Sequence, residues 1–486
     1  MNALKLKALA KKQKFFNKKD PEYSSDDSDG ELTDDDETEV SKNYVNYVFD
    51  NRYLCIKYLG RGTFSRVWLV LDLQENKYYA MKTIFSKYLD DSKHEISVNQ
   101  KLKNNNIKNV LIMEHHFLDN KRNELCIITK LLGKSVNELL MIDYGDDNHS
   151  EEDNNSEEDI HSEEDIHSEE DNHSEEDNHS EEDNHSEEDN FTSPSLKIVK
   201  KFISDVSKGL EELHRKNIVH TDLKFENILI DKLDNNLENM INKINNLNLC
   251  ELYLEKVNSC LPENYENIDK VKKKKIKRKA KIKAINLFQT YLIENKIINF
   301  DNLENEESNI YDIENMDVNS YNFIIIDLGN VEYVNNREQD EIMIRSYRPP
   351  ENIMGSYYDT KADMWCLGCL VYELITNNTL FNVSRKKNSL DRDRYHLHLM
   401  YEYLGKMPKE LTQNCDFSED LFDRKGNVLK NKKCDYSSLE ELLYDESTYN
   451  ESEIEEVSIF LNKLLVYDHK KRISSKECSN LDWIKS

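Results

Sequence analysis

The chain has few of the residues that interrupt regular structure or cross-link a fold. Its 486 residues include only 11 Gly and 6 Pro, and the nine Cys follow no regular spacing. The one close pair, Cys366 and Cys369, lies in the apolar run MWCLGCLVYELI and has no second pair with which to complete a zinc site. We therefore expect reduced core thiols and an intracellular location, in the cytoplasm, the nucleus or both.

Long apolar runs are also missing. None reaches the roughly 18 residues that a membrane span requires, and the lysine-containing start lacks the apolar centre of a signal peptide. Lys and Arg are absent between Asp143 and Asp189, where 24 acidic residues account for most of the formal charge of −29. The rest of the chain is close to neutral. We expect no membrane association, no direct nucleic-acid site and a monomer.

Three segments have the composition of tails or insertions. Residues 1–42 run from a basic into an acidic stretch with too little apolar content to fold alone. Residues 143–193 form an acidic insertion that repeats HSEEDN with a six-residue step, which matches no packed repeat, so we expect both segments to be disordered. Residues 231–320 form an Asn-, Lys- and Glu-rich spacer.

The remaining sequence predicts an α+β fold of two lobes. Residues 43–142 alternate strand-like runs with one helix-like stretch, SKHEISVNQKLK, which indicates a small, mostly β lobe. From residue 194 to 486 apolar residues recur three and four apart, which indicates a larger, mostly α lobe. The lobes join near residues 129–133. The spacer interrupts the second lobe between two strand-like runs, ILI and NFIIIDLG, which must come together.

A glycine-containing turn follows the first long strand-like run. In LGRGTFSRVWL, Gly60 and Gly62 let the backbone approach phosphates closely, and Phe64 can cover the tip of the loop. Taken alone, such a turn is more often structural. With the segment between the lobes it supplies our candidate nucleotide-binding residues: Leu59, Gly60, Arg61, Gly62, Thr63, Phe64, Ser65, Arg66, Val67, Thr129 and Leu131.

Lys82 strengthens the interpretation of the turn. It lies about twenty residues later in YYAMKTIF, as expected of a lysine that grips the α- and β-phosphates of a nucleotide. Glu95, on the helix that follows, is our candidate ion-pair partner. The alternatives Asp90 and Asp91 come too early, before that helix begins.

The most specific motif is IVHTDLKFENILI. Phosphoryl transfer needs a carboxylate to position the attacking hydroxyl and accept its proton, and Asp222 fits this role. Lys224 can neutralise the γ-phosphate, and Asn227 can bind Mg²⁺ through a hard oxygen. In IIIDLGN, Asp327 leaves a buried strand and is costly there unless it meets a cation, which predicts a second Mg²⁺ ligand.

These motifs resemble those of eukaryotic protein kinases over about residues 50–142, 194–230 and 321–486. The likeness is closest to the SR-protein kinase family, whose GxGxFSxVWL, HTDxKxEN and DLGN motifs all occur here, as does its long spacer. LAMMER kinases are the second resemblance. They are disfavoured because they usually have DFG, whereas this chain has Leu328 in the middle position.

The resemblance implies a bilobal kinase that uses ATP and Mg²⁺ to phosphorylate Ser or Thr in basic or Arg/Ser-rich proteins. The acidic residues with which family members dock arginine are only partly kept, in LDRDRYHLHL. Two alternatives are a pseudokinase scaffold and a kinase of non-protein substrates. The first is disfavoured because Lys82, Asp222, Asn227 and Asp327 are all present, and the second because RSYRPPE resembles a peptide-binding segment.

Two charged segments suggest further partners. Each of the seven serines in the acidic repeat is followed by Glu, Glu and Asp, the context favoured by acidophilic kinases of the casein kinase 2 type. The run VKKKKIKRKAKIK in the spacer is interpretable as a solvated, mildly helical charge run, a nuclear import signal or an anchor for the acidic repeat.

Overall fold

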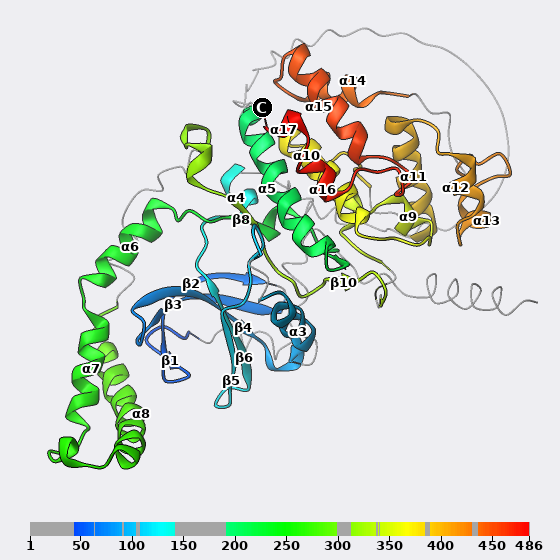
Figure 1. Ribbon diagram of the computed structural model, residues 1–486. Coiled ribbons are helices and arrows are strands. Elements are labelled where there is room, and N and C mark those ends of the chain that lie inside the picture. The colour runs from blue at the N-terminus through cyan, green and yellow to red at the C-terminus, as the bar shows by residue number, and fades with distance from the viewer. Residues whose placement is uncertain are drawn as a thin grey trace, which may run out of the picture.

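The computed structural model describes residues 43–140, 191–298 and 313–485, apart from short gaps at 63, 90–91, 104–106, 337–338, 340, 384–388 and 430–435. The tail 1–42 and residues 141–190, which include the whole acidic repeat, therefore lie outside the described residues, as do Thr63, Asp90 and Asp91. The described chain forms the two expected lobes, with the strands of the first and the helices of the second on opposite sides of the connecting segment (Figure 1).

The first lobe is a six-stranded sheet with one helix. The strands lie in the order β1-β2-β3-β4-β6-β5 and every neighbouring pair is antiparallel. Their bounds are β1 Val48–Phe49, β2 Tyr53–Gly62, β3 Ser65–Asp72, β4 Lys77–Ile84, β5 His115–Asp119 and β6 Glu124–Lys130. Helix α3, Ser92–Leu102, lies between β4 and β5 and follows the short 3₁₀ turn η1, Ser86–Tyr88.

The sheet is apolar on both faces, which follows from the period of two along a strand. In β2, Tyr53 and Cys55 pack with Trp68 in one cluster, whereas Leu54 and Ile56 pack in another on the opposite face. A strand whose side chains are apolar on both faces must be covered on both sides. Tyr44 and Phe49 help to cover the first face, and the spacer covers the second.

The spacer folds into three helices that pack on the first lobe. They are α6 Asn235–Asn245, α7 Leu249–Ser259 and α8 Lys270–Glu294, with the turn η3, Tyr265–Asn267, before α8. Met240, Tyr253 and Phe288 are buried with the leucines of β2 and β3. In Figure 1 α6 descends past the sheet and α7 and α8 form a hairpin beyond it. The described part of the spacer thus packs as part of the fold.

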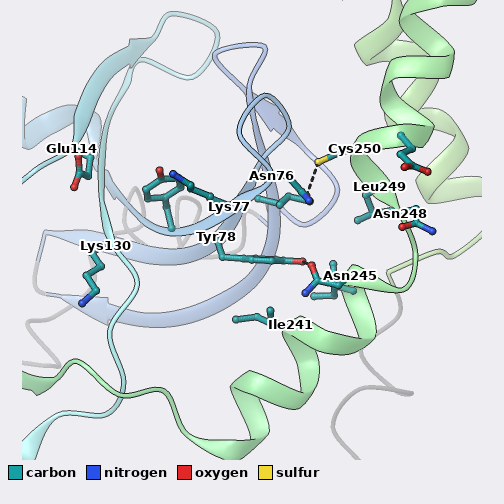
Figure 2. Close-up of a pocket in the computed structure, with 14 residues that line it drawn as sticks. Asn76, Lys77, Tyr78, Glu114, Lys130, Ile241, Asn245, Asn248, Leu249 and Cys250 are labelled. Carbon is teal, nitrogen blue, oxygen red and sulfur yellow. Dashed lines mark hydrogen bonds between the residues drawn. The ribbon is translucent and has the colours of Figure 1, made fainter. Parts of the chain in front are cut away.

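A cavity of about 680 Å³ lies between these helices and the sheet. Figure 2 shows it bounded by the start of β4 on one side and by α6 and α7 on the other. The hydroxyl of Tyr78 donates to Asn245 Oδ1 at 2.9 Å, and the thiol of Cys250 donates to Asn76 Oδ1 at 3.1 Å. This cavity contains none of the predicted catalytic residues.

The second lobe is helical, and its two long buried helices are α5 and α10. Its bounds are α4 Val136–Leu140, α5 Leu196–His214, α9 Pro350–Ile353, α10 Lys361–Thr376, α11 Ser389–Leu404, α12 Lys409–Gln413, α13 Ser418–Leu421, α14 Leu439–Glu446, α15 Glu451–Leu464, α16 Ser475–Cys478 and α17 Asp482–Lys485. Ile198, Phe202 and Val206 recur along α5 at the predicted spacing and are buried. Helix α10 is buried along nearly its whole length.

Short strands and turns of this lobe flank the loops that face the first lobe. They are β7 Ile218–Val219, β8 Ile228–Ile230, β9 Phe323–Ile325 and β10 Glu332–Tyr333, with turns η2 Phe225–Asn227, η5 Ile313–Asn315, η6 Val318–Ser320 and η7 Arg345–Tyr347. The two strands that flank the spacer pair antiparallel, with Ile228 opposite Ile325, as the sequence predicted.

The eight described cysteines are free. Burial raises the pKa of the Cys366 and Cys369 thiols well above the usual value, so both are protonated core residues, as expected. Across the described part of the chain, no helix combines the length and the apolar character needed to span a bilayer.

Candidate active site

Three charged side chains meet where the two lobes join. Lys82 Nζ, on β4, lies 3.2 Å from Glu95 Oε2 on α3 and 3.1 Å from Asp327 Oδ1, just after β9. The Lys82 side chain is 24% exposed although two carboxylates hold it, so its ammonium group is still partly accessible. This geometry presents one cation of the first lobe at the junction of the lobes, where it could bind an anion.

The electrostatics of the three groups follow from burial and charge. Burial alone would lower the pKa of Lys82, but the two carboxylates outweigh it and hold that pKa above its usual value. Burial raises the pKa of Glu95 despite the nearby ammonium. At Asp327 burial acts in the same direction, but Lys82 and the backbone N–H of Gly329 outweigh it and lower the pKa. Asp327 is therefore the firmly ionised carboxylate of the pair.

Helix α3 is fastened to the segment that follows Asp327. His94 Nε2 lies 2.8 Å from the carbonyl oxygen of Val331, and Lys101 Nζ donates to the Tyr333 hydroxyl at 3.2 Å. Lys101 also lies over the Tyr333 ring, 4.6 Å from its centroid. Because His94 precedes Glu95, these contacts fix the helix turn that brings Glu95 to Lys82.

The glycine-containing turn is the β2–β3 hairpin. Gly60 pairs with Val67 and Gly62 with Ser65. A Cβ at Gly60 would meet no atom within 4 Å, which leaves the backbone open to a close ligand. The Phe64 ring is exposed at the tip of the hairpin and lies at a tilt beside Tyr88, with the ring centroids 4.5 Å apart.

Arg66 belongs to this hairpin, but its side chain is buried in the first lobe. Its guanidinium lies 3.6 Å from Glu124 and 4.9 Å from the Tyr44 ring centroid, in the cluster with Trp68. The next residue, Val67, is only partly buried and lies on the opposite face of the strand. Only the backbone of Arg66 is therefore available to a nucleotide.

The connection between the lobes makes an unusually close backbone contact. Thr129 pairs with Ala80 near the end of β6, and Leu131 is buried just beyond it. The N–H of Gly133 donates to the carbonyl oxygen of Ile230 at 2.8 Å, and a Cβ at Gly133 would lie 1.9 Å from the carbonyl oxygen of Lys232. Glycine is required there by this approach.

The catalytic-loop motif places several side chains around Asp222. Asn227 Nδ2 donates to Asp222 Oδ2 at 3.1 Å and Asn330 Nδ2 donates to the same oxygen at 3.2 Å. Lys224 Nζ lies 3.7 Å from Asp222 Oδ1. The carboxylate is 20% exposed, so it is oriented by its neighbours and still open toward the cleft.

Asp363 anchors the backbone of this loop. Its fully buried carboxylate accepts hydrogen bonds from the backbone N–H of His220 at 2.8 Å and of Thr221 at 3.2 Å, and His214 Nε2 lies 2.8 Å away. The Thr221 hydroxyl in turn donates to the carbonyl oxygen of Asn330 at 2.6 Å. The loop and the segment after Asp327 are therefore held as one unit.

Asn227 and Asp327 fit the requirements of a Mg²⁺ site. The N–H of Ile326 donates to the carbonyl oxygen of Asn227 at 2.9 Å, which keeps the two positions adjacent. The amide nitrogen of Asn227 points to Asp222, so its amide oxygen is left as a ligand. Within the described ranges there is no group of three or more His, Cys, Asp or Glu that could hold a metal ion.

The acidic residues of LDRDRYHLHL are engaged within the protein. Asp393 is 3% exposed and lies 2.7 Å from Arg345, which is in the predicted peptide-binding segment. Asp391 lies 3.0 Å from Arg394. Nearby, Arg348 pairs with Glu341 at 3.0 Å. In this arrangement Asp393 braces that segment, whereas Asp391 pairs within its own helix.

Sequence reasoning had assigned no role to Asn330, His94 or the Gly133 contact. Asn330 ends the DLGN motif, so its place in the motif was a usable signal for its contact with Asp222. The His94 contact joins residues 237 positions apart, and no local pattern indicates it.

A β-rich lobe and an α-rich lobe, with a lysine–carboxylate cluster and an oriented aspartate between them, define the class of bilobal phosphotransferases to which protein kinases belong. The family model described as "Protein kinase domain" matches residues 175–265 and 308–484, more than half of the chain. The chain belongs to the protein kinase family.

The relatives extend the likeness to one branch of that family. The chain is 29% identical over 286 residues to serine/threonine-protein kinase SRPK of Physarum polycephalum, and 30% identical over 161 residues to protein kinase dsk1 of Schizosaccharomyces pombe. These matches cover 58% and 33% of this chain and 59% and 29% of those proteins. The predicted resemblance to SR-protein kinases is confirmed.

A solved structure supports the fold. The crystal structure of a kinase domain aligns with a TM-score of 0.55 and 18% identity, and the alignment covers 91% of this chain and 98% of that one. The predicted bilobal α+β kinase fold is confirmed. Protein kinases as a family use ATP and Mg²⁺.

Proposed function

We propose that this chain is a serine/threonine protein kinase that transfers the γ-phosphate of ATP to basic or Arg/Ser-rich proteins inside the cell. The observation that carries the proposal is the joint placement of the lysine–carboxylate cluster and the oriented Asp222 carboxylate at the junction of the lobes. A pseudokinase scaffold would be expected to lack at least one of these groups.

The proposed roles follow from where each side chain lies. Lys82 contacts the α- and β-phosphates while Glu95 holds its ammonium group, and the open backbone at Gly60 lets the hairpin cover the nucleotide. Thr129 and Leu131 border the base at the connection between the lobes. Asp222 positions the substrate hydroxyl and accepts its proton, and Lys224 offsets charge on the transferred phosphate.

Asn227 and Asp327 would hold Mg²⁺, which supplies charge neutralisation at the phosphates when it is bound. Before binding, Asp327 faces Lys82 and Asn227 faces Asp222. Both side chains are thus held in place by partners that also belong to the site.

The substrate preference rests on charge near the catalytic loop. Glu226, between Lys224 and Asn227, is exposed, and its negative charge favours a basic partner at this loop. Asp393 is buried against Arg345 and Asp391 pairs with Arg394 of its own helix, so we assign arginine recognition to the loop around Glu226 instead of to α11.

The test of activity is transfer of radiolabelled phosphate to a serine/arginine peptide and to a generic basic protein. The Asp222→Asn variant should lose turnover by about 10²-fold or more while it keeps its ATP affinity, because a positioned proton acceptor contributes on this scale. Full activity of a folded Asp222→Asn variant would falsify the assignment. An inactive wild-type chain that still binds its partners would favour the pseudokinase alternative.

The test of specificity is a peptide array. Basic serine peptides should be preferred, and Glu226→Gln should reduce that preference more than Asp391→Asn does. Preference for acidic or tyrosine peptides would exclude the proposed substrate class without affecting the assignment of Asp222.

A further inference from the structure

The first half of α8 is a strongly basic surface. Residues 270–283 contain ten Lys and Arg and no acidic residue, and we call this segment the basic half of α8. Eight of the ten cations are exposed: Lys270, Lys272, Lys274, Lys275, Lys277, Arg278, Lys279 and Lys283. By contrast, the second half of the same helix buries Phe288 and Leu292 against the first lobe. The C-terminal half of α8 therefore packs on the first lobe, and its N-terminal half exposes the positive charge.

This charge is poorly compensated inside the described structure. Among the residues that can be placed, only Lys273 has an acidic ion-pair partner, Glu266 at 2.9 Å. Apart from the N-cap Asp269, whose carboxylate accepts a hydrogen bond from the N–H of Val271, the first turn of α8 has no acidic side chain, so the cations lie at the helix end where the backbone dipole disfavours them. Like charges four residues apart, such as Lys274 and Arg278, disfavour the helix further. An anionic partner would remove both penalties.

The chain itself contains an anionic segment of matching size. Residues 141–190 include the 24 acidic residues between Asp143 and Asp189, with no Lys or Arg among them. Polyanion and polycation in one chain meet at an effective concentration in the millimolar range when the linker allows it, so even weak pairing is favoured over partners in solution.

The two segments also leave the fold at the same place. Ser135, just before α4, forms a bridge with Leu229 of β8, after which the spacer begins. On the return side, the N–H of Ser195 donates to Glu314 Oε1 at 2.8 Å, where the spacer ends. Both ends of the acidic segment are therefore anchored beside both ends of the spacer that carries α8.

The length of the acidic segment is sufficient for contact. A 25-residue arm spans about 28 Å as a flexible coil and up to roughly 80 Å when extended. The whole of α8, with 25 residues, is about 37 Å long. Since like charges extend a chain, either arm of the segment can reach the spacer helices.

We propose that residues 141–190 bind the basic half of α8 within the same molecule. The acidic segment then serves as the counter-charge of this helix and keeps it from external polyanions. Because the groups are exposed, the interaction is screened over about 8 Å at physiological salt and weakens as salt rises.

The test measures how fast the lysines of α8 react with an amine-acylating reagent in the full chain, by mass spectrometry of each site. One variant replaces Glu and Asp of residues 151–189 by Gln and Asn at unchanged length, and a matched control only permutes the residues of this segment. At low salt, neutralisation should speed acylation of the α8 lysines by about three-fold or more, as expected for a helix occupied two thirds of the time. Lys121, an exposed lysine of the first lobe, should react equally in all chains.

Several results would overturn the proposal. Equal acylation of α8 in the neutralised and permuted chains at low salt is one. Retention of the difference in 1 M salt is another, because it would not be electrostatic. A third uses a duplex DNA as probe: if the intact chain binds it as tightly as the neutralised chain, and Lys272→Gln with Lys274→Gln and Lys275→Gln abolishes that binding, then the basic half of α8 is open to external polyanions.

Discussion

Lys82 is the side chain on which the charge balance of the cleft depends. It lies between two carboxylates that would otherwise repel each other. It lowers the pKa of Asp327 and so keeps that carboxylate ionised, whereas burial raises the pKa of Glu95. Lys82, Glu95 and Asp327 were predictable from the sequence, because phosphoryl transfer needs a cation, a carboxylate and oxygen ligands in a fixed order.

The orientation of the Arg66 side chain was not predictable. Both faces of its strand are apolar, so the pattern does not indicate which face lies toward the junction of the lobes.

Replacement of Lys82 by Met should reduce kcat/KM by about 10²-fold or more, on the scale of other charge-stabilising contacts in active sites. Lys77 is a matched control because it lies on the same strand, is 66% exposed and makes only a long surface pair with Glu75 at 3.8 Å. Lys77→Met should leave kcat/KM unchanged. A comparable loss in both variants, measured by steady-state kinetics, would argue against a specific role of Lys82.

His396 should make stability depend on pH. Its ring is fully buried beside Phe381, and burial together with Arg345 and Arg348 holds its pKa well below the usual value. The unfolded chain takes up a proton near pH 6.5 that the folded chain rejects, so stability is complete above about pH 6.5 and is lost below it, by about 1.4 kcal/mol at pH 5.5.

The measurement is the thermal unfolding midpoint at pH 5.5 and 7.5. His396→Phe keeps a ring against Phe381 and should reduce the difference between the two midpoints. His398→Gln, on the same helix but only partly buried, should not. The same pH difference in wild type and His396→Phe would exclude His396 as its source.

At the scale of elements, α3 is positioned by the segment after Asp327 as well as by the sheet. The spacing of apolar residues predicted the long strands, α3 and the helical character of the second lobe. It missed β1, which has two residues, and β5, HHFLD, in which two histidines hide the apolar alternation. Of the spacer helices, α6 and α7 were missed and α8 was anticipated only as a mildly helical charge run, because it combines a charged half with an apolar half and so has no consistent amphipathic stripe.

The contact of His94 with Val331 should matter for nucleotide use. His94→Ala removes the donor at 2.8 Å from the Val331 carbonyl oxygen and loosens the turn that carries Glu95. We expect KM for ATP to rise several-fold, with a smaller change in kcat. His94→Gln can still donate a hydrogen bond and should recover most of the loss. If Gln behaves as Ala does in the kinetics, the effect is one of packing and the positioning role is wrong.

At the scale of the molecule, the spacer connects the lobes. It begins and ends on strands of the second lobe and packs on the sheet of the first. The sequence predicted that β8 and β9 must meet, but it could not show where the residues between them would pack. The continuous apolar run WLVL of β3 was the available signal that the sheet is covered on both faces.

Phe288→Ala should therefore destabilise the first lobe, although the residue belongs to the second lobe in sequence. Phe288 is fully buried with Tyr253 and the β2–β3 leucines, so the cavity should cost about 3–5 kcal/mol. Leu287→Ala is the control, since Leu287 is 46% exposed on the same helix and its loss should change stability by about 0.5 kcal/mol or less. Urea unfolding of both variants distinguishes a packed spacer from a loosely attached one.

The position of the spacer has a consequence for synthesis on the ribosome. The strands β2 and β3 leave the ribosome early, but Phe288 and Leu292, which cover one of their faces, follow only after some 200 further residues. At about 5–20 residues per second this delay lasts roughly 10–40 s. During this interval the leucines of the nascent sheet remain open to water and to other chains, so the first lobe should require chaperone protection until the middle of the chain has emerged.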